Sequence, residues 1–135
     1  MSDGSPEPKL GPPRPLRDEE VAIIRKLLSG TANEARVRHQ LSDALVQDMS
    51  DGGMGSIQFC RSSPEKRMFA DEVGEGSFCD SDGVLVSVTL NADQFGDLFE
   101  LDLWKVDFSP LNRYPDPEDF EIVERHGQLG FPPKL

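Results

Sequence analysis

The sequence has few of the side chains that usually carry catalysis or hold metals. Among its 135 residues are two cysteines, Cys60 and Cys79, and two histidines, His39 and His126. No C-x-x-C or H-x-x-x-H spacing joins them, and no known cysteine-protease or redox signature is present. Both cysteines are expected to be small core residues. We therefore predict no catalytic residue, no metal site and no cofactor, and the balance is against an enzyme.

Long apolar runs are also absent. No stretch approaches the roughly 20 apolar residues of a membrane span. The N-terminus, Met1-Ser-Asp-Gly-Ser-Pro, has neither the basic start nor the apolar run of a signal peptide. Two cysteines without a secretion signal indicate free thiols in a reducing compartment. These absences predict a soluble, cytoplasmic protein that does not contact a membrane.

Positive charge is scarce in the second half of the chain. The net charge is −11, and residues 70–124 hold fifteen Asp/Glu against Lys105 and Arg113 alone, whereas residues 1–40 are nearly balanced. Such a field repels nucleic acid and attracts cations or basic proteins. A solubilising surface would explain a plain excess of acids equally well. The concentration of acids in one segment is what favours a binding surface.

Prolines gather at the two ends of the sequence. Residues 1–15 contain five of the eleven prolines, which predicts a disordered leader. Residues 109–135 are also rich in proline and lack periodicity, so they are expected to form an irregular strap. The predicted organisation is a leader over 1–15, a single domain over 16–114 and a strap or tail over 115–135.

The middle of the chain changes from helical to strand periodicity. A helix is predicted over 16–30, with acids first, bases last and Gly30 after it, and a shorter one over 33–41 with Asn33 as N-cap. Strands are predicted over 44–49, 56–60, 67–79, 84–90 and 98–108, with Gly74 and Gly76 marking a bulge in the third. This order predicts an α+β fold: two N-terminal helices packed on an antiparallel sheet of about five strands.

The last predicted strand changes parity. Apolar residues alternate on one face up to Leu103 and on the other from Trp104 onward. Such a switch requires a bulge or burial on both faces. We therefore expect one face of the sheet to pack on the helices and the other to be covered in part by the C-terminal tail.

Two phrases of the sequence carry a family resemblance. They are Asp51-Gly-Gly-Met-Gly-Ser56 and Phe99-Glu-Leu-Asp-Leu-Trp-Lys-Val-Asp-Phe-Ser-Pro-Leu111. They resemble the signatures of a small bacterial family of stand-alone domains of unknown function, over about Leu16 to Tyr114. The resemblance implies a bacterial, cytoplasmic, single-domain protein, and it brings no activity and no residue roles.

Two loops resemble ligand sites but fit turns better. The run from Asp80 to Gly83 begins like a calcium loop, yet Val84, Leu85 and Asn91 stand where an EF-hand needs a ligand, a glycine and a glutamate. A hairpin turn explains the same residues. The glycines at 52–55 could form an anion-binding nest, but they lack the lysine and the helix of a P-loop.

The acids of the last strand have two interpretations. Glu100 and Asp102 share one strand face, where they could hold a cation or raise each other's pKa, or simply be solvated. Trp104 is the single tryptophan, and it could be an interface anchor or a core residue beneath the strap.

Our leading hypothesis is a binding module whose acidic sheet face engages a basic protein. One form of it is an immunity or antitoxin protein that masks the cationic surface of a nuclease-like toxin. The candidate partner-binding residues are Asp80, Asp82, Asp93, Asp97, Glu100, Asp102 and Trp104. The alternative is a divalent-cation-dependent or small-ligand-binding enzyme that uses carboxylates around Asp80, Asp82 and Glu100. The sequence does not determine the oligomeric state, and a third hypothesis is a subunit that oligomerises through an open sheet edge.

Overall fold

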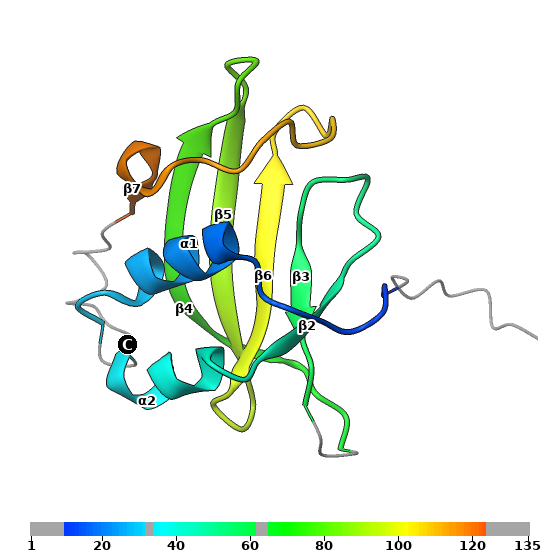
Figure 1. Ribbon diagram of the computed structural model, residues 1–135, viewed down its shortest axis with the longest axis vertical. Coiled ribbons are helices and arrows are strands. Elements are labelled where there is room, and N and C mark those ends of the chain that lie inside the picture. Colours follow the sequence, from blue (N-terminus) through cyan, green and yellow to red (C-terminus); the bar gives the residue numbers. More distant parts are fainter. Residues whose placement is uncertain (1–9, 32–33, 62–64, 124–135) are drawn as a thin grey trace, which may run out of the picture.

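The computed structural model describes residues 10–31, 34–61 and 65–123. Figure 1 shows how the helices and strands follow one another along the chain. The elements are β1 (Arg14–Pro15), α1 (Asp18–Leu28), α2 (Glu34–Arg38), β2 (Leu45–Asp48), β3 (Ile57–Phe59), β4 (Phe69–Cys79), β5 (Leu85–Asp93), β6 (Leu98–Lys105) and β7 (Glu121–Ile122). Two 3₁₀ turns, His39–Leu41 and Pro117–Asp119, follow α2 and precede β7.

The strands form one antiparallel sheet in the order β1-β2-β3-β6-β5-β4-β7. The prediction of two helices on about five strands is therefore wrong, because the described fold is mostly β and has seven strands. The two additional strands lie at the edges and have two residues each. Strands this short show no alternation in the sequence, and proline, as at Pro15, is tolerated at a sheet edge.

The segment predicted as the second helix is too short to be a full helix. It has five α-helical residues followed by one 3₁₀ turn, and β2 begins soon afterwards at Leu45. The predicted N-cap, Asn33, lies outside the described residues. Only α1, with 11 residues, has several turns in the part of the chain that is described.

Helix α1 confirms the prediction from charge and periodicity. Its first turn is acidic, its last turn basic, and Gly30 adopts φ +78° after it. Ile23, Ile24, Leu27 and Leu28 are buried against the sheet. The backbone N–H of Arg17 donates to Glu20 at 2.8 Å, which satisfies one of the free donors at the helix start.

Two glycines of β4 allow other elements to approach the sheet. A Cβ at Gly74 would lie 2.8 Å from the carbonyl oxygen of Leu27 in α1, and one at Gly76 would lie 2.7 Å from the carbonyl oxygen of Glu121 and collide with the buried Phe120. The predicted bulge is confirmed near Gly74, where the register shifts after Glu72. Gly76 pairs regularly with Val88, so its role is close packing.

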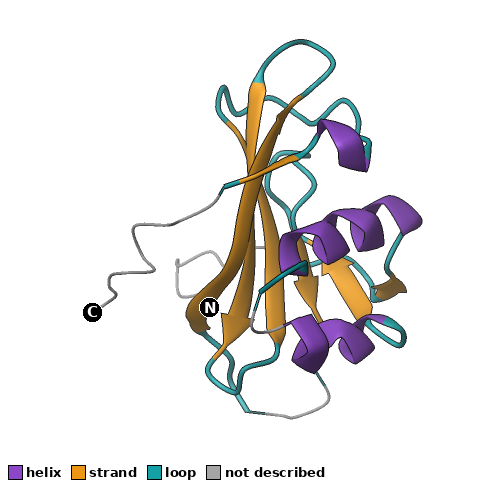
Figure 2. Cartoon of the chain, turned by 90° about the vertical axis from the view of Figure 1, so that its left-hand side faces the viewer, coloured by secondary structure: helices purple, strands orange, loops and turns teal. Residues whose placement is uncertain are grey.

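One face of the sheet is left open by the described helices. Figure 2 shows α1 and α2 on the same side of the sheet, and in Figure 1 the segment that leads to β7 passes on that side as well. Val106 and Phe108 are exposed. The expectation that the tail covers the second face is therefore wrong for the described residues, because Phe120 draws the strap onto Gly76 on the helix side.

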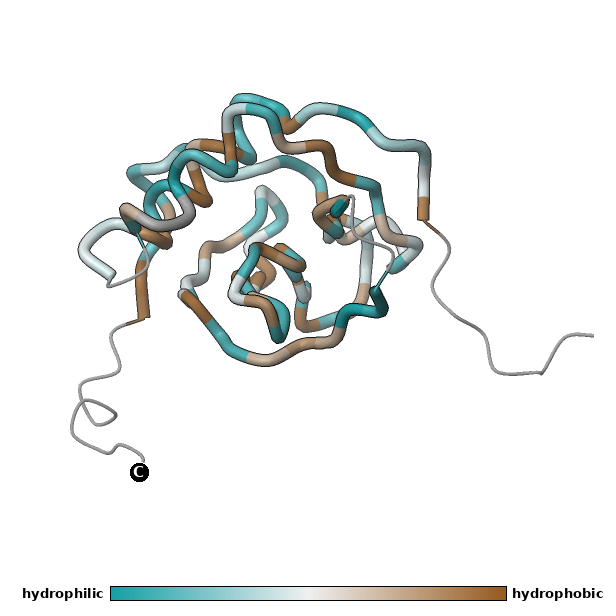
Figure 3. The backbone as a smooth tube through the Cα atoms, turned by 90° about the horizontal axis from the view of Figure 1, so that it is seen from below, coloured by the Kyte–Doolittle hydropathy of each residue, from teal (hydrophilic) through white to brown (hydrophobic). Residues whose placement is uncertain are grey.

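The described chain begins and ends at opposite sides of the molecule (Figure 3). This follows from the places of β1 and β7 at the two edges of the sheet. Hydrophobic and hydrophilic positions alternate along much of the tube in Figure 3, as expected for a sheet with one packed face. Among the described helices, none is long and apolar enough to cross a membrane.

Candidate functional site

Asp80 and Asp82 lie around a buried lysine. The ammonium group of Lys105, at the end of β6, is 2.8 Å from Asp80 Oδ2 and 2.7 Å from Asp82 Oδ2, and it donates to the carbonyl oxygen of Pro110 at 3.0 Å. Lys105 and Asp80 are buried, whereas Asp82 is exposed. These two predicted partner-binding residues therefore already have an internal cation.

The electrostatics of this cluster follow from its contacts. Burial alone would raise the pKa of Asp80, but hydrogen bonds from the Asn112 N–H and from Lys105 outweigh it and lower the pKa to about 2. Burial likewise opposes the charge of Lys105, yet the two aspartates raise its pKa. The cluster ties the β4–β5 hairpin to β6 and to the start of the strap, which is a structural role.

The hairpin interpretation of the calcium-like loop agrees with the geometry. The Gly83 N–H donates to the carbonyl oxygen of Asp80 at 2.8 Å, and Gly83 has a φ of +83°. In the described residues, no group of three or more His, Cys, Asp or Glu side chains is arranged to hold a metal ion. The carboxylates around Asp80 and Asp82 therefore converge on the ammonium group of Lys105.

Asp93 and Asp97 also have internal partners. Asp93 is buried, pairs with Arg67 at 2.8 Å, and accepts backbone N–H groups of the turn that leads to β6. Burial raises the pKa of Asp93, but the hydrogen bonds from Arg67 and from that turn lower it overall. Asp97 pairs with Arg61 at 3.1 Å. Both carboxylates therefore already have a cation within the chain.

Glu100, Asp102 and Trp104 differ from those residues because they project from β6 onto the open face. The intervening residues Leu101 and Leu103 are buried on the helix side, so strand alternation places the other three together. No salt bridge to Glu100 or Asp102 is formed within the described chain. The sequence therefore predicted their common face correctly.

The two carboxyl groups lie in surroundings that disfavour their charge. Burial raises the pKa of Glu100, and the negative charge of Asp102 adds to it. Burial also raises the pKa of Asp102, and the charge of Asp51 adds to that, against a hydrogen bond from Ser56. Ser56 Oγ lies 3.3 Å from Asp102 Oδ1 and 3.2 Å from the carbonyl oxygen of Leu103, so its single hydrogen serves one of the two at a time.

Trp104 forms an exposed aromatic pair with Phe108. Their ring centroids are 6.1 Å apart at 54°, and Trp104 is 46% and Phe108 68% exposed. Phe108 has a φ of +64°, which is a conformation that a bulky side chain rarely adopts. Of the two interpretations of Trp104, the exposed one fits the structure, and no core of the described chain contains it.

Asn91 completes the open face beside the carboxylates. Its Cα lies opposite that of Glu100 in the β5–β6 register, and its side chain hydrogen-bonds the Glu100 carboxylate. Asn91 is 9% exposed, and its Oδ1 has no hydrogen-bond partner among the described residues. Sequence reasoning missed this residue because the predicted strand ended at residue 90, whereas β5 continues to Asp93 and pairs Asn91 with Glu100.

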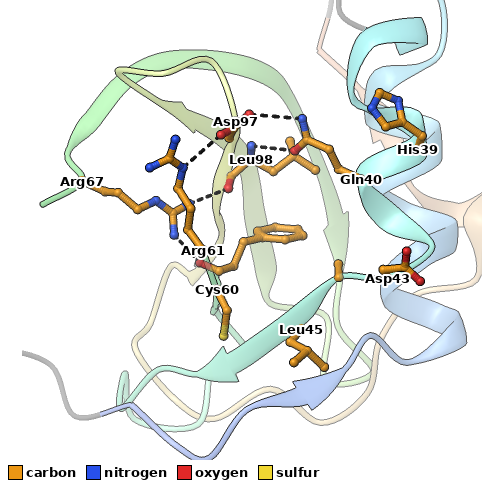
Figure 4. A pocket seen from close by; sticks show the side chains of 11 residues that line it. His39, Gln40, Asp43, Leu45, Cys60, Arg61, Arg67, Asp97 and Leu98 are labelled. Atoms are coloured by element: carbon orange, nitrogen blue, oxygen red, sulfur yellow. Dashed lines mark hydrogen bonds and ion pairs between the residues drawn. The ribbon is translucent and has the colours of Figure 1, made fainter. Parts of the chain in front are cut away.

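A cavity of about 730 Å³ opens at the surface of the molecule (Figure 4). It lies between the segment after α2 and the ends of β2 and β3, and its lining includes His39, Cys60, Arg61, Arg67 and Asp97. In Figure 4, His39 lies on the helical segment, apart from Cys60. The Cys60 thiol instead lies 3.6 Å from Gln47 Oε1. The two are therefore not arranged as a catalytic pair.

The glycine-rich loop proposed as an anion nest is filled by its own carboxylate. Asp51 accepts the backbone N–H groups of Met54 at 3.0 Å and Ser56 at 3.1 Å. Gly52, Gly53 and Gly55 have φ values of +79°, +83° and +99°, which explains the glycines of this phrase. The turn interpretation is therefore the one that the geometry supports.

The two cysteines lie at the surface of the structure. Cys60 and Cys79 are both free and exposed, so the prediction that they are core residues is wrong. Alternation places Cys79 on the face opposite its buried neighbour Phe78. His126 lies outside the described residues.

The comparison with known proteins identifies a family without an assigned activity. A family model described as a domain of unknown function (DUF6984) matches residues 13–115, which include both signature phrases. No curated protein and no solved structure matches the chain. The two phrases also meet in space, because the N–H of Leu111 donates to the carbonyl oxygen of Gly53 at 2.9 Å. The chain therefore belongs to the DUF6984 family, a family of domains of unknown function.

Proposed function

We propose that this protein is a binding module that engages a basic partner protein through the open face of its sheet. The observation that carries the proposal is the row of Glu100, Asp102 and Trp104 on β6. The row combines two carboxylates that form no salt bridge in the described chain with an exposed tryptophan. Tryptophan is enriched at the hot spots of protein interfaces.

Charge supports a basic rather than a neutral partner. Glu100 and Asp102 are held where burial raises their pKa, so a cation brought to them would lower the cost of keeping them ionised. The surplus of acids in residues 70–124 would also steer a cationic protein to this region and make association fast and salt-dependent. Asp80, Asp82, Asp93 and Asp97 add to this field through their position, although their own hydrogen bonds are internal.

The proposal also includes a biological role and a cellular compartment. An immunity or antitoxin protein that covers the cationic surface of a nuclease-like toxin has these requirements, and we place it in the cytoplasm of a bacterium. The two exposed, free thiols support a reducing compartment. Repulsion between the acidic field and phosphate supports a protein partner instead of nucleic acid.

The test is capture of a partner from host lysate by three forms of the protein. The wild type is compared with E100K/D102K, which reverses the open face, and with D116K/E118K, which changes the net charge equally. Asp116 and Glu118 are exposed on the strap that packs on the helix side. Bound proteins are eluted with steps of sodium chloride and identified by mass spectrometry.

The expected result is one basic protein that the wild type and D116K/E118K retain and E100K/D102K loses. The salt concentration of its elution should be the same for the first two forms. Equal loss from both double variants would show that net charge alone, and not this face, holds the protein. Equal retention by all three forms would show that neither matters. Either result would overturn the proposal.

A second candidate, binding of a small ligand, is favoured by the cavity in Figure 4. Its volume of about 730 Å³ lies in the range of small-molecule sites, and its lining mixes Phe59 and Leu98 with charged side chains. Thermal unfolding in the presence of divalent cations and of metabolite mixtures would test it, because a ligand that binds only the folded state raises the Tm. H39A should remove such an increase, and an unchanged Tm throughout would reject this candidate.

A further inference from the structure

The side chains of the row on the open face repeat at the period of an extended chain. Glu100, Asp102 and Trp104 are alternate residues of β6, so neighbouring side chains of this row are spaced about 6.7 Å apart along the strand. A partner segment in extended conformation also presents every second side chain at this interval. A helix repeats its side chains at a different interval, so the row selects an extended occupant.

The chemistry of the first two positions calls for hydrogen-bond donors. Ionised carboxylates only accept, and the Asn91 Oδ1 beside Glu100 is an acceptor with no partner in the described chain, on a residue that is 9% exposed. This oxygen is independent of the acidic row and points to the same ligand chemistry. Arg67, whose charge acts on Glu100, is already engaged by Asp93 and by the carbonyl oxygens of Phe59 and Leu98.

The third position calls for a cation with a flat face. The rings of Trp104 and Phe108 are 6.1 Å apart and tilted by 54°, which leaves an exposed aromatic surface at the end of the acidic row. Arginine stacks on aromatic rings and also binds carboxylates through two parallel N–H groups. Lysine offers a point charge and cannot make the second contact.

We infer that the partner binds through an extended segment with arginine at every second position, whose guanidinium groups lie on Glu100, on Asp102 and on the Trp104–Phe108 pair. This inference rests on the proposed function and specifies which part of the partner occupies the face. It assigns Asn91 to binding, since a guanidinium on Glu100 has donors to spare for Asn91 Oδ1.

Two synthetic peptides of equal charge and composition test the spacing. One is Thr-Arg-Thr-Arg-Thr-Arg-Thr, and the other is Thr-Thr-Arg-Arg-Arg-Thr-Thr, both blocked at their ends. Binding is followed by titration calorimetry and by the fluorescence of Trp104, which is the single tryptophan of the chain. The proteins are the full chain, E100Q/D102N, and the control D116N/E118Q.

The alternating peptide should bind about tenfold more tightly than the block peptide, because it places three cations in register. It should change the emission of Trp104, and E100Q/D102N should abolish the preference while D116N/E118Q retains it. N91A should weaken the alternating peptide and leave the block peptide unchanged.

Three results would overturn the inference. Equal affinities for the two peptides would show that only net charge matters and would reject the alternate spacing of the arginines. The proposed function would still hold in that case if E100K/D102K loses the partner from the lysate. An unchanged emission of Trp104 would show that the peptide does not contact the aromatic pair. Failure of both peptides to bind would reject an arginine segment, whereas the proposed function fails only when the lysate experiment shows no dependence on the open face.

Discussion

Two regions of the molecule hold aspartates in opposite circumstances, one around the ammonium group of Lys105 and the other on the open face of β6. On one side of the molecule, the carboxylate of Asp80 is buried with Lys105 and its pKa is lowered to about 2. On the open face, Asp102 forms no salt bridge in the described residues, and burial with the nearby charge of Asp51 raises its pKa. A count of acids does not distinguish the two. The ionised carboxylate of Asp80 stabilises the folded protein, whereas that of Asp102 lowers the free energy of unfolding.

This difference separates structural charge from charge that is available to a partner. Four of the six acids that the sequence proposed for binding have Lys105, Arg67 or Arg61 as internal partners. The remaining two, Glu100 and Asp102, lie on the same face of β6 as the exposed Trp104. The proposed binding surface thus rests on the two carboxylates that form no salt bridge within the described residues.

The largest expected effect comes from removing a structural carboxylate. D80A should lower the free energy of unfolding by about 3 kcal/mol at pH 7, because the ammonium of Lys105 stays buried with one partner lost. D102A, on the open face, should change it by less than about 1 kcal/mol. Urea denaturation of the wild type, D80A and D102A gives both differences in the free energy of unfolding. Similar losses for D80A and D102A would show that the two carboxylates do not differ in their contribution to stability.

The loss in D80A should also depend on pH. The folded-state pKa of Asp80, about 2, lies below its ordinary value of 3.8, so its contribution is present above that ordinary value and is lost as the pH falls through the lower one. The difference between D80A and the wild type should therefore shrink between about pH 4 and pH 2.

The next largest effect is expected from the close packing at Gly76, on the helix side of the sheet. G76A should cost about 2 kcal/mol, because the added Cβ would lie 2.7 Å from the Glu121 carbonyl oxygen and against Phe120. The matched control is S77A, one residue along β4 and on the opposite face, which should stay within about 0.5 kcal/mol of the wild type. Thermal unfolding compares them, and a tolerated G76A would mean that Phe120 does not pack as described.

A smaller effect of opposite sign is expected on the open face. Folding raises the pKa of Glu100 and Asp102, so their stabilising contribution is present below their ordinary pKa values and is lost as the pH rises through the raised ones. E100Q/D102N should therefore be more stable than the wild type at pH 7, by less than about 1 kcal/mol. The gain should vanish near pH 3, and a destabilised variant at pH 7 would show that these charges support the fold.

The smallest effect concerns the strained aromatic residue. F108G should leave stability unchanged or raise it by up to about 0.5 kcal/mol, since relief of the φ of +64° is offset by the flexibility of glycine. The same variant should weaken partner binding. A loss of more than about 1 kcal/mol in chemical denaturation would assign Phe108 to the fold and not to the binding surface.

Local patterns predicted the interior of the fold well. The charge order and apolar stripe predicted α1, and the Asp82-Gly83 pair predicted the hairpin between β4 and β5. The glycine loop between β2 and β3 was likewise predicted from its residues. These features depend on neighbours in sequence, and that information is present in the chain itself.

Features that depend on distant residues escaped prediction. β1 and β7 are defined by their pairing with β2 and β4, and two residues show no periodicity. Lys105 shares the parity of Leu101 and Leu103, which was a signal for its burial, but an isolated lysine is normally exposed. The cations that bind Asp80 and Asp93 come from 25 and 26 residues away, so sequence spacing did not reveal which acids stay available.

The proline of the edge strand β1 has a consequence for how two molecules can meet. At the outer strand β1, Pro15 has no N–H to donate, and its carbonyl oxygen already accepts from Arg14 Nη1 at 2.9 Å. A strand from another molecule would find neither donor nor free acceptor at this residue, which is how natural sheets resist growth from their borders. Fibre-like stacking is therefore disfavoured at this border of the sheet.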